Sequence, residues 1–211
     1  MAMRSATQIL QEMAMKKLVV AVFALGLLTA CSSEPSKPAQ VEKPKPPEPI
    51  TARNAFQKCY IAARNWARDA QPYRIESILT DDSKGREGKS RAWRVGFASP
   101  TQQHSSRPYT WEDGEVSFGV EDSYSPSNTS TTVFDQAFLK VDSNQALDTA
   151  QKHGGDKLLE KAPDTPILYI VDWNRQTNEL TWHVIYGTAP VSAKLRVAVN
   201  ASTGDFLRVE K

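Results

Sequence analysis

The sequence is short of the side chains that most enzymes use. Only three histidines and two cysteines occur in 211 residues. The HExxH, GxSxG, CxxC and phosphate-binding-loop motifs are all absent from the chain. These absences argue against the common zinc, serine-hydrolase, thiol-exchange and nucleotide sites. We therefore expect no catalytic, metal-binding or cofactor-binding residues and a protein that is not an enzyme.

The chain also lacks an excess of charge of one sign. Its 26 basic and 24 acidic residues give a formal net charge of +2, and no Lys/Arg-rich run occurs in the body of the chain. Nucleic-acid-binding proteins normally carry a basic patch or stripe, so no nucleic-acid partner is expected. The mean hydropathy of −0.48 argues against a protein with several membrane spans.

One apolar run is present, close to the N-terminus. Lys16 and Lys17 precede thirteen apolar or small residues, which end at Ala30. A basic start, a short apolar core and a small-residue exit are typical of a secretory signal, and a spanning helix would need roughly 20 residues. We interpret residues 1–30 as a signal peptide. Residues 1–14 precede a complete signal and are either an extended basic region or the result of a mis-assigned start codon.

The end of this signal resembles the lipobox of bacterial lipoproteins, Leu-x-Ala-Cys, at residues 28–31. The resemblance implies lipid on the Cys31 thiol, hence a membrane anchor; the alternative is an ordinary signal that happens to precede a cysteine. Residues 31–49 contain six prolines and predict an extended tether, with a reach of about 50 Å at about 3.1 Å per residue. By the same resemblance, Ser32 is compatible with an outer-membrane location facing the periplasm.

The folded part begins with a predicted helix at residues 50–70, on whose apolar stripe Cys59 is expected as a buried small side chain. Four strand-like runs follow at residues 73–80, 91–98, 107–111 and 115–120, and Asp113-Gly114 predicts a tight hairpin between the last two. The pattern then restarts. Residues 142–162 predict a helix with Ser143 as its N-cap and a break near Gly154-Gly155, before strands at residues 167–173, 179–187, 193–200 and 205–210.

Two landmarks place these halves in register. Trp93-x-Val95 corresponds to Trp182-x-Val184 at an offset of 89 residues, and Gly114 corresponds to Gly204 at an offset of 90. Offsets that agree within one residue indicate an internal repeat. We predict an α+β fold of two tandem, two-layer modules, each with one helix on a four-stranded antiparallel sheet. The modules span residues 50–120 and 137–211, with a polar linker at residues 121–136.

The second module, over residues 141–211, resembles the PepSY domain of bacterial lipoproteins and peptidase propeptides. The resemblance is carried by "SNQALDTAQKHGG", Trp182-x-Val184 and "VAVNASTGDFL", where Asn200 and Asp205 stand in place of the family's Asp and Glu. The first module shows only the helix and the Trp-x-Val strand and is interpreted as a degenerate copy. The resemblance implies a PepSY/cystatin-like fold without catalytic activity, and the binding or restraint of a partner protein such as a peptidase.

Few surface residues stand out as recognition candidates. Trp111 and Trp173 lie at predicted strand ends beside turns, where exposed aromatic rings can form a binding patch; the alternative is rings folded over the sheet edge. His183 is expected on the outward side of its strand. The leading hypothesis is a lipid-anchored envelope protein that binds or restrains a protein partner. The alternatives are a structural or accessory envelope lipoprotein, or a small-ligand binder in the helix–sheet groove.

Overall fold

A computed structural model describes residues 47–101 and 104–210, which belong to one compact unit. The predicted signal peptide, Cys31 and most of the predicted tether lie outside the described residues. None of the helices within the described part has the length and apolar character of a membrane span.

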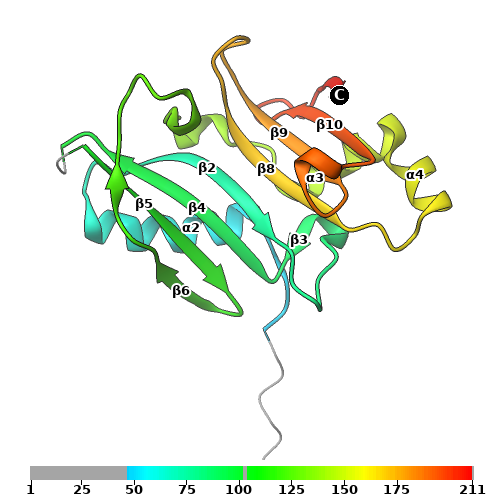
Figure 1. Cartoon of the computed structure of the whole chain (residues 1–211), viewed down its shortest axis with the longest axis horizontal. Helices are drawn as coiled ribbons and strands as arrows, with labels where there is room; N and C mark the ends of the chain where they lie inside the picture. The colour runs from blue at the N-terminus through cyan, green and yellow to red at the C-terminus, as the bar shows by residue number, and fades with distance from the viewer. Residues whose placement is uncertain (1–46, 102–103, 211) are drawn as a thin grey trace, which may run out of the picture. The chain divides into compact units, whose positions relative to one another are not determined.

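The fold is built on one large antiparallel sheet (Figure 1). Its strands are β2 (Gln71–Ile78), β4 (Ala92–Ser99), β5 (Ser105–Glu112), β6 (Glu115–Phe118), β7 (Asp122–Ser123), β8 (Ile167–Asn174), β9 (Glu179–Tyr186), β10 (Leu195–Asn200) and β11 (Phe206–Glu210). The order is β11-β10-β9-β8-β2-β4-β5-β6, and β7 pairs with β5 beside this path. Two runs of four consecutive strands therefore meet at the antiparallel β2–β8 pair, where Ile75 lies opposite Val171.

Helix α2 (Ala52–Trp66) follows β1 (Ile50–Thr51), which pairs with β3 (Lys89–Ser90). It buries a stripe of small and aromatic side chains: Ala52, Ala55, Phe56, Cys59 and Ala63. This stripe, with the helical spacing read from the sequence, faces β4 and β5. The prediction of a buried Cys59 is confirmed.

The second helical segment consists of α3 (Ser143–Ala150), a π-turn η4 (Gln151–Gly155) and α4 (Asp156–Lys161). The predicted break is confirmed, because Gly154 has a φ of 116°, which favours glycine. The predicted N-cap is wrong: Asp142 caps α3 in a capping box with Gln145, and Ser143 is the first helical residue.

The two helices begin side by side, and the second caps the first. The Ala52 amide donates to Ser143 Oγ at 2.9 Å, and the Arg53 amide donates to Asp142 Oδ1 at 3.0 Å. Ser143 Oγ in turn donates to the Gly88 carbonyl at 2.6 Å. Because α2 has no side-chain cap of its own, its first amides depend on these residues from the other half of the chain.

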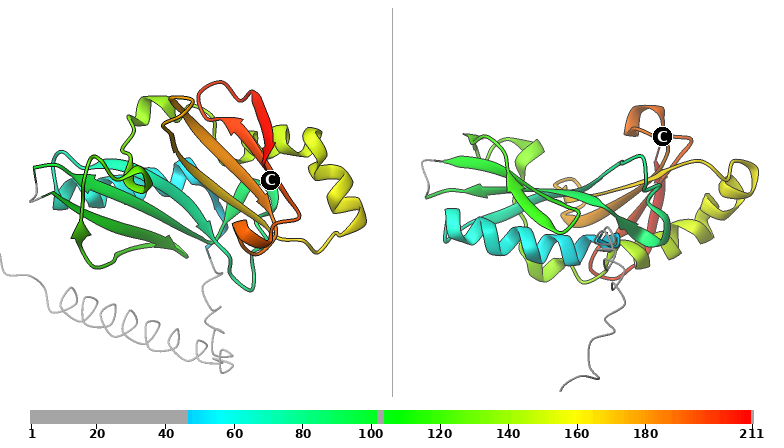
Figure 2. Two further views of the ribbon diagram at one scale, coloured as in Figure 1. Left: turned by 45° about the horizontal axis from the view of Figure 1, so that its top comes forward. Right: turned by 90° about the horizontal axis from the view of Figure 1, so that it is seen from below.

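All helices of the described residues that pack on the sheet cover the same face of it (Figure 2). The larger of two hydrophobic clusters lies between them and contains Trp93 and Trp182 at 0% exposure. The predicted α+β fold with an antiparallel sheet is confirmed, and the sheet runs continuously through both halves. Within the predicted linker, Phe134 is buried in this core and its amide donates to the Pro72 carbonyl.

Short 3₁₀ turns complete the chain: η1 (Arg86–Gly88), η2 (Thr129–Thr131), η3 (Gln136–Phe138) and η5 (Pro190–Ser192). The hairpin predicted at Asp113-Gly114 is confirmed, with φ of 45° and 99°. At the β10–β11 hairpin, Asn200 Oδ1 accepts from the amides of Ser202 and Thr203. Ser202 Oγ donates to the Phe138 carbonyl, which ties this hairpin to the segment that leads into α3.

Candidate functional site

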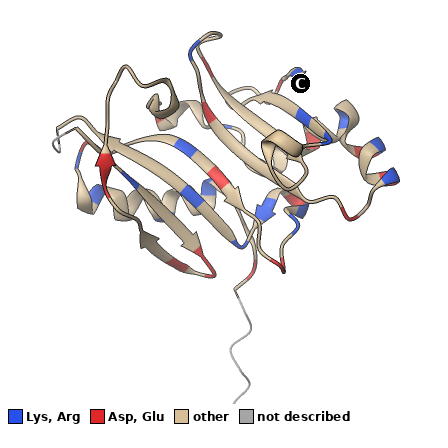
Figure 3. Ribbon diagram, in the orientation of Figure 1, with Lys and Arg blue, Asp and Glu red and all other residues tan. Residues whose placement is uncertain are grey.

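Several strands of the sheet carry charged residues (Figure 3), and ion pairs between their side chains form a cluster on the face opposite the helices. On each strand, residues that alternate with core residues point to this face; Ile75 and Val171 are buried, so their neighbours Arg74 and Asp172 face away from the helices. We call the cluster the open-face network. Its members, from six neighbouring strands, are Arg74, Glu76, Arg94, Asp172, His183, Arg196, Arg208 and Glu210.

Glu210 is the most buried member and lies at one end of the network. Its Oε2 lies 2.8 Å from His183 Nδ1 and 3.1 Å from Arg196 Nη2, and its Oε1 lies 2.9 Å from Arg208 Nη2. Burial alone would raise the pKa of this carboxyl. The hydrogen bond from His183 and the three neighbouring positive charges outweigh burial and lower the pKa to about 2.

His183 bridges two carboxylates. Nδ1 contacts Glu210, and Nε2 lies 3.4 Å from Asp172 Oδ1. Burial lowers the pKa of the imidazole, but the hydrogen bonds and charges of Asp172 and Glu210 raise it to about 9. The ring is therefore an imidazolium at neutral pH, which has no lone pair for a metal ion or a substrate proton.

Arg74 on β2 links the two halves of the network, because it pairs with residues on both β2 and β8. Its Nε binds Glu76 at 2.9 Å and its Nη1 binds Asp172 at 2.9 Å. Glu76 also accepts from Arg94 Nη1 at 3.1 Å. Each carboxylate of the network thus has at least two cationic partners, and the arginines and His183 link strands from both halves of the sheet.

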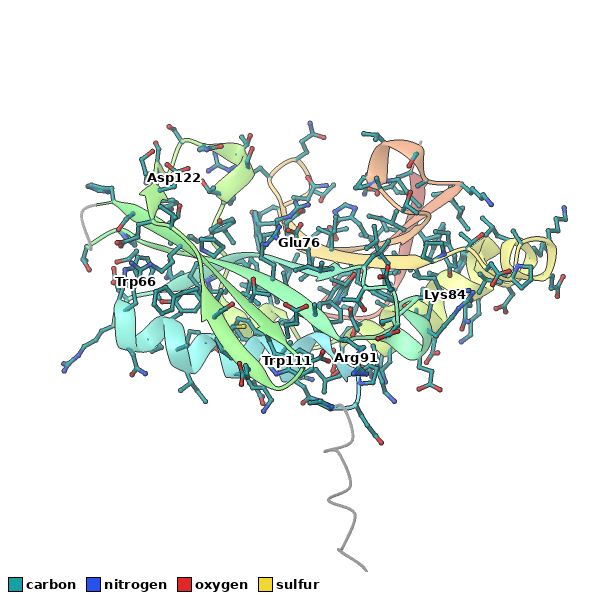
Figure 4. The ribbon with its side chains drawn as sticks, turned by 60° about the horizontal axis from the view of Figure 1, so that its bottom comes forward. Trp66, Glu76, Lys84, Arg91, Trp111 and Asp122 are labelled. Carbon is teal, nitrogen blue, oxygen red and sulfur yellow. The ribbon has the colours of Figure 1, made fainter. Side chains whose placement is uncertain are left out.

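The sequence-predicted tryptophans do not form one surface patch. Trp111 is only 2% exposed, because the alternation along β5 directs it to the same side as α2, where β4 and β6 flank it. Figure 4 places Trp111 on the helix side and Glu76 on the opposite side of the sheet. Trp111 is therefore not a candidate for partner binding. Its ring packs inside the fold, as the alternative interpretation of the sequence expects.

Trp173 is half-buried at the end of β8. Its ring packs edge to face on Phe138, with centroids 5.3 Å apart, and Phe138 is 45% exposed. Two strands, β2 and β4, separate Trp173 from the strand of Trp111. This pair is a small apolar surface on the helix side of the sheet, at the border of the main core.

Two other reactive side chains of the described residues, Cys59 and His153, pack against their neighbours. Burial raises the pKa of the Cys59 thiol to about 12, against the weaker opposite effect of a backbone hydrogen bond with Trp111. The His153 ring stacks on Phe206 with centroids 3.8 Å apart. Within residues 47–101 and 104–210, no three His, Cys, Asp or Glu side chains are grouped so that they could hold a metal ion.

Sequence reasoning did not find the open-face network. Its signal is present, since charged residues alternate with apolar ones in all the strands involved. The partners, however, are far apart in the chain: Arg74 and Asp172 are separated by 98 residues. Only the strand order brings them together.

Comparisons with known proteins add one structural likeness. No protein-family model and no curated protein matches the sequence. Among solved structures, the chain is similar to the crystal structure of a "putative lipoprotein" from Clostridium difficile 630. The TM-score is 0.49 at 10% sequence identity, over 74% of this chain and 91% of that one. A TM-score below 0.5 is too low to establish a shared fold.

Proposed function

We propose that the protein is a lipid-anchored, non-enzymatic protein of the bacterial envelope that binds a partner protein through the open face of its sheet. The observation that carries this proposal is the open-face network itself. Eight charged side chains hold one another in fixed positions on a face that no α-helix of the described residues covers. Ordering long charged side chains costs entropy, so such an array suits recognition better than solubility alone.

The anchor in this proposal is Cys31. The lipobox at residues 28–31 and the proline-rich residues 31–49 support it, as does the burial of Cys59, the other cysteine, inside the fold. Two acyl chains give stable membrane attachment, since each buried methylene contributes about 0.8 kcal/mol. With Ser32 after the lipid-bearing residue, we propose an outer-membrane location facing the periplasm.

A non-enzymatic role is supported by how the reactive side chains are used. Cys59 stays protonated inside the core, and His183 is held as a cation between two carboxylates. Neither is offered to a substrate as a nucleophile or a base.

We further propose that the fold consists of two copies of one helix-plus-four-strand unit, fused at their first strands. The strand order on either side of the β2–β8 pair and the head-to-head start of α2 and α3 support this. The PepSY resemblance of residues 141–211 makes a peptidase the first partner to test, with restraint of its activity as the effect.

An accessory envelope lipoprotein remains the second candidate function, because a stable partner could be a component of an assembly. Binding of a small ligand between helix and sheet is not favoured. That space is filled by side chains at 0% exposure, among them Trp93, Trp182 and Tyr169.

The experiment uses the full chain with a C-terminal affinity tag, cross-linked in envelopes and purified in non-ionic detergent. We expect one specific protein partner, and a loss of peptidase activity when the purified chain is added if that partner is a peptidase. Capture of an assembly component favours the accessory role. If nothing is cross-linked, or Cys31→Ser leaves a fully processed, membrane-bound chain, the proposal is wrong in its binding or its anchoring part.

A further inference from the structure

We propose that the open face binds an acidic, extended polypeptide segment of the partner, whose carboxylates pair with the outward guanidinium groups of the network. These groups belong to Arg74, Arg94, Arg196 and Arg208. The inference rests on the proposed function, and it names the surface and the chemistry of the segment that it recognises.

As a group, the carboxylates of the network are more deeply buried than its arginines. The side chains of Glu76, Asp172 and Glu210 are between 9% and 30% exposed, whereas those of the four arginines are between 29% and 51% exposed. Five cations, counting His183, face three carboxylates. The part of the network that a partner can touch is therefore predominantly cationic, although the chain as a whole is nearly neutral.

The exposed guanidinium groups retain donors for a partner. Each has five N–H groups, yet within the described part of the chain Arg94 uses only Nη1, for Glu76, and Arg208 uses only Nη2, for Glu210. The carboxylates of the network already accept from two or more cations, so they do not need these donors. A planar guanidinium pairs with a carboxylate through two parallel hydrogen bonds, which makes a carboxylate-bearing segment a fitting ligand.

The dimensions fit an extended chain. Arg196 on β10 and Arg94 on β4 are four strand spacings apart in the sheet order, which is about 19 Å at about 4.8 Å per strand. A peptide of about six extended residues spans the same distance at about 3.3 Å per residue. Acidic side chains at alternate positions would all point to the sheet.

A bilayer fits this face less well than a single chain does. The segments 121–132 and 187–194 project on this side of the sheet at its two ends (Figure 2). A flat membrane would meet these segments before the arginines between them. The network also contains no lysine. The acidic Glu112, Glu115 and Glu179 lie at strand ends, so they confine the cationic area to the middle of the sheet.

The test measures binding of fluorescent ten-residue peptides to the full chain in non-ionic detergent. One peptide alternates Glu with Thr, and the controls replace each Glu by Gln or by Lys. The variant R94Q/R208Q removes the two most exposed arginines of the network. Its matched control, R64Q/R68Q, removes two exposed arginines on the helix side of the sheet, Arg64 in the last turn of α2 and Arg68 in the turn that follows it.

We expect the Glu peptide to bind at least tenfold more tightly than the Gln and Lys peptides. R94Q/R208Q should raise its Kd about tenfold, whereas R64Q/R68Q should change it less than twofold. If R94Q/R208Q does not fold, R94Q alone, which loses one exposed ion pair, should raise the Kd about threefold.

Three results would overturn the inference. The first is equal affinity for the Glu and Gln peptides, and the second is an equal rise of the Kd in both double variants. The third is that the chain binds phosphatidylglycerol vesicles more tightly than the Glu peptide and that this vesicle binding also depends on Arg94 and Arg208. Partner cross-linking separates this failure from failure of the proposed function. If R94Q/R208Q captures the partner as well as the wild-type chain does, the function stands and the inference fails; if the wild-type chain captures nothing, the function itself fails.

Discussion

Trp93 and Trp182 lie 89 residues apart in the chain and make the same hydrogen bond. The indole N–H of Trp93 donates to the Ile50 carbonyl at 2.9 Å, and that of Trp182 donates to the Val141 carbonyl at 3.0 Å. Each acceptor directly precedes the N-cap residue of a helix, Thr51 for α2 and Asp142 for α3. Each half of the sheet thus fixes the entry of its own helix with one buried indole.

Removal of either indole hydrogen bond should lower the free energy of unfolding by a similar amount. Trp93→Phe and Trp182→Phe each leave a carbonyl without its partner in the core, which costs roughly 1–3 kcal/mol besides the change in ring volume. Urea unfolding should show similar losses for both variants. Trp66→Phe is the control, because its indole binds the exposed Glu121, and it should cost less. A large loss for only one of the buried pair would contradict equivalent roles.

Ser143→Ala should weaken the start of α2 and its link to Gly88. The hydroxyl accepts from the Ala52 amide and donates to the Gly88 carbonyl, and Ser143 is 0% exposed. Loss of both bonds should cost roughly 2–4 kcal/mol and speed hydrogen exchange in the first turn of α2. Ser202→Ala, which loses one bond at the surface, is the control. Unchanged exchange in α2 would show that its first amides do not depend on Ser143.

The pair of His183 and Glu210 predicts a stability plateau with two limits. The pKa of His183 is raised from 6.5 to about 9, so its contribution is complete below about pH 6.5 and disappears as the pH rises through about 9. The pKa of Glu210 is lowered from 4.5 to about 2, so its contribution is complete above pH 4.5 and disappears as the pH falls through about 2. Both contributions are complete between about pH 4.5 and 6.5.

Urea unfolding across pH and NMR titration of the His183 ring measure these limits. One pKa unit corresponds to about 1.4 kcal/mol, so the loss on the alkaline side should amount to a few kcal/mol. His183→Gln should flatten the profile between about pH 6.5 and 9. A ring that titrates near 6.5 in the folded protein would rule out the bridging geometry.

Cys59 should be unreactive in the folded protein. Its side chain is 0% exposed and its pKa is raised to about 12, so almost no thiolate is available. The lipidated full chain should react with a maleimide only when guanidinium unfolds it, at a rate that reports unfolding. Rapid labelling under native conditions would mean that α2 detaches from the sheet.

The two candidate tryptophans should differ in their cost of removal. Trp111→Ala deletes a ring from the core and should cost about 3–5 kcal/mol. Trp173→Ala removes a half-buried ring that packs on Phe138 and should cost less, so it is the variant that can report on partner binding. Partner binding that survives Trp173→Ala would leave this aromatic pair without a recognition role.

Much of the fold was predictable from the sequence because its signals are local. Alternation and turn residues such as Asp113-Gly114 act over a few positions, so the sequence predicts every strand in the two runs of four within about two residues of its observed ends. The end of a strand gave no reliable sign of exposure. Trp111 is covered because β6 extends the sheet beyond it and α2 lies below it, and both are tertiary facts.

The choice between Asp142 and Ser143 as N-cap shows the same limit. Both residue types are good N-caps, so the local sequence does not distinguish them. In the structure the serine hydroxyl does not cap its own helix, because it bonds to the Ala52 amide and the Gly88 carbonyl. The β2–β8 pairing, on which the open-face network depends, likewise joins strands about 95 residues apart and leaves no local mark in the sequence.

The place where the chain enters the fold has a mechanical consequence. Ile50 joins the fold through a separate two-stranded sheet, where it pairs with Ser90, and its carbonyl accepts from the indole of Trp93 on β4, an interior strand of the large sheet (Figure 1). A force applied through the residues that precede Ile50 would act on these hydrogen bonds and on the start of α2 before it acted on any outer strand. Tension on the chain would thus be resisted at the centre of the domain, and the edge strands β6 and β11 would not be peeled away first.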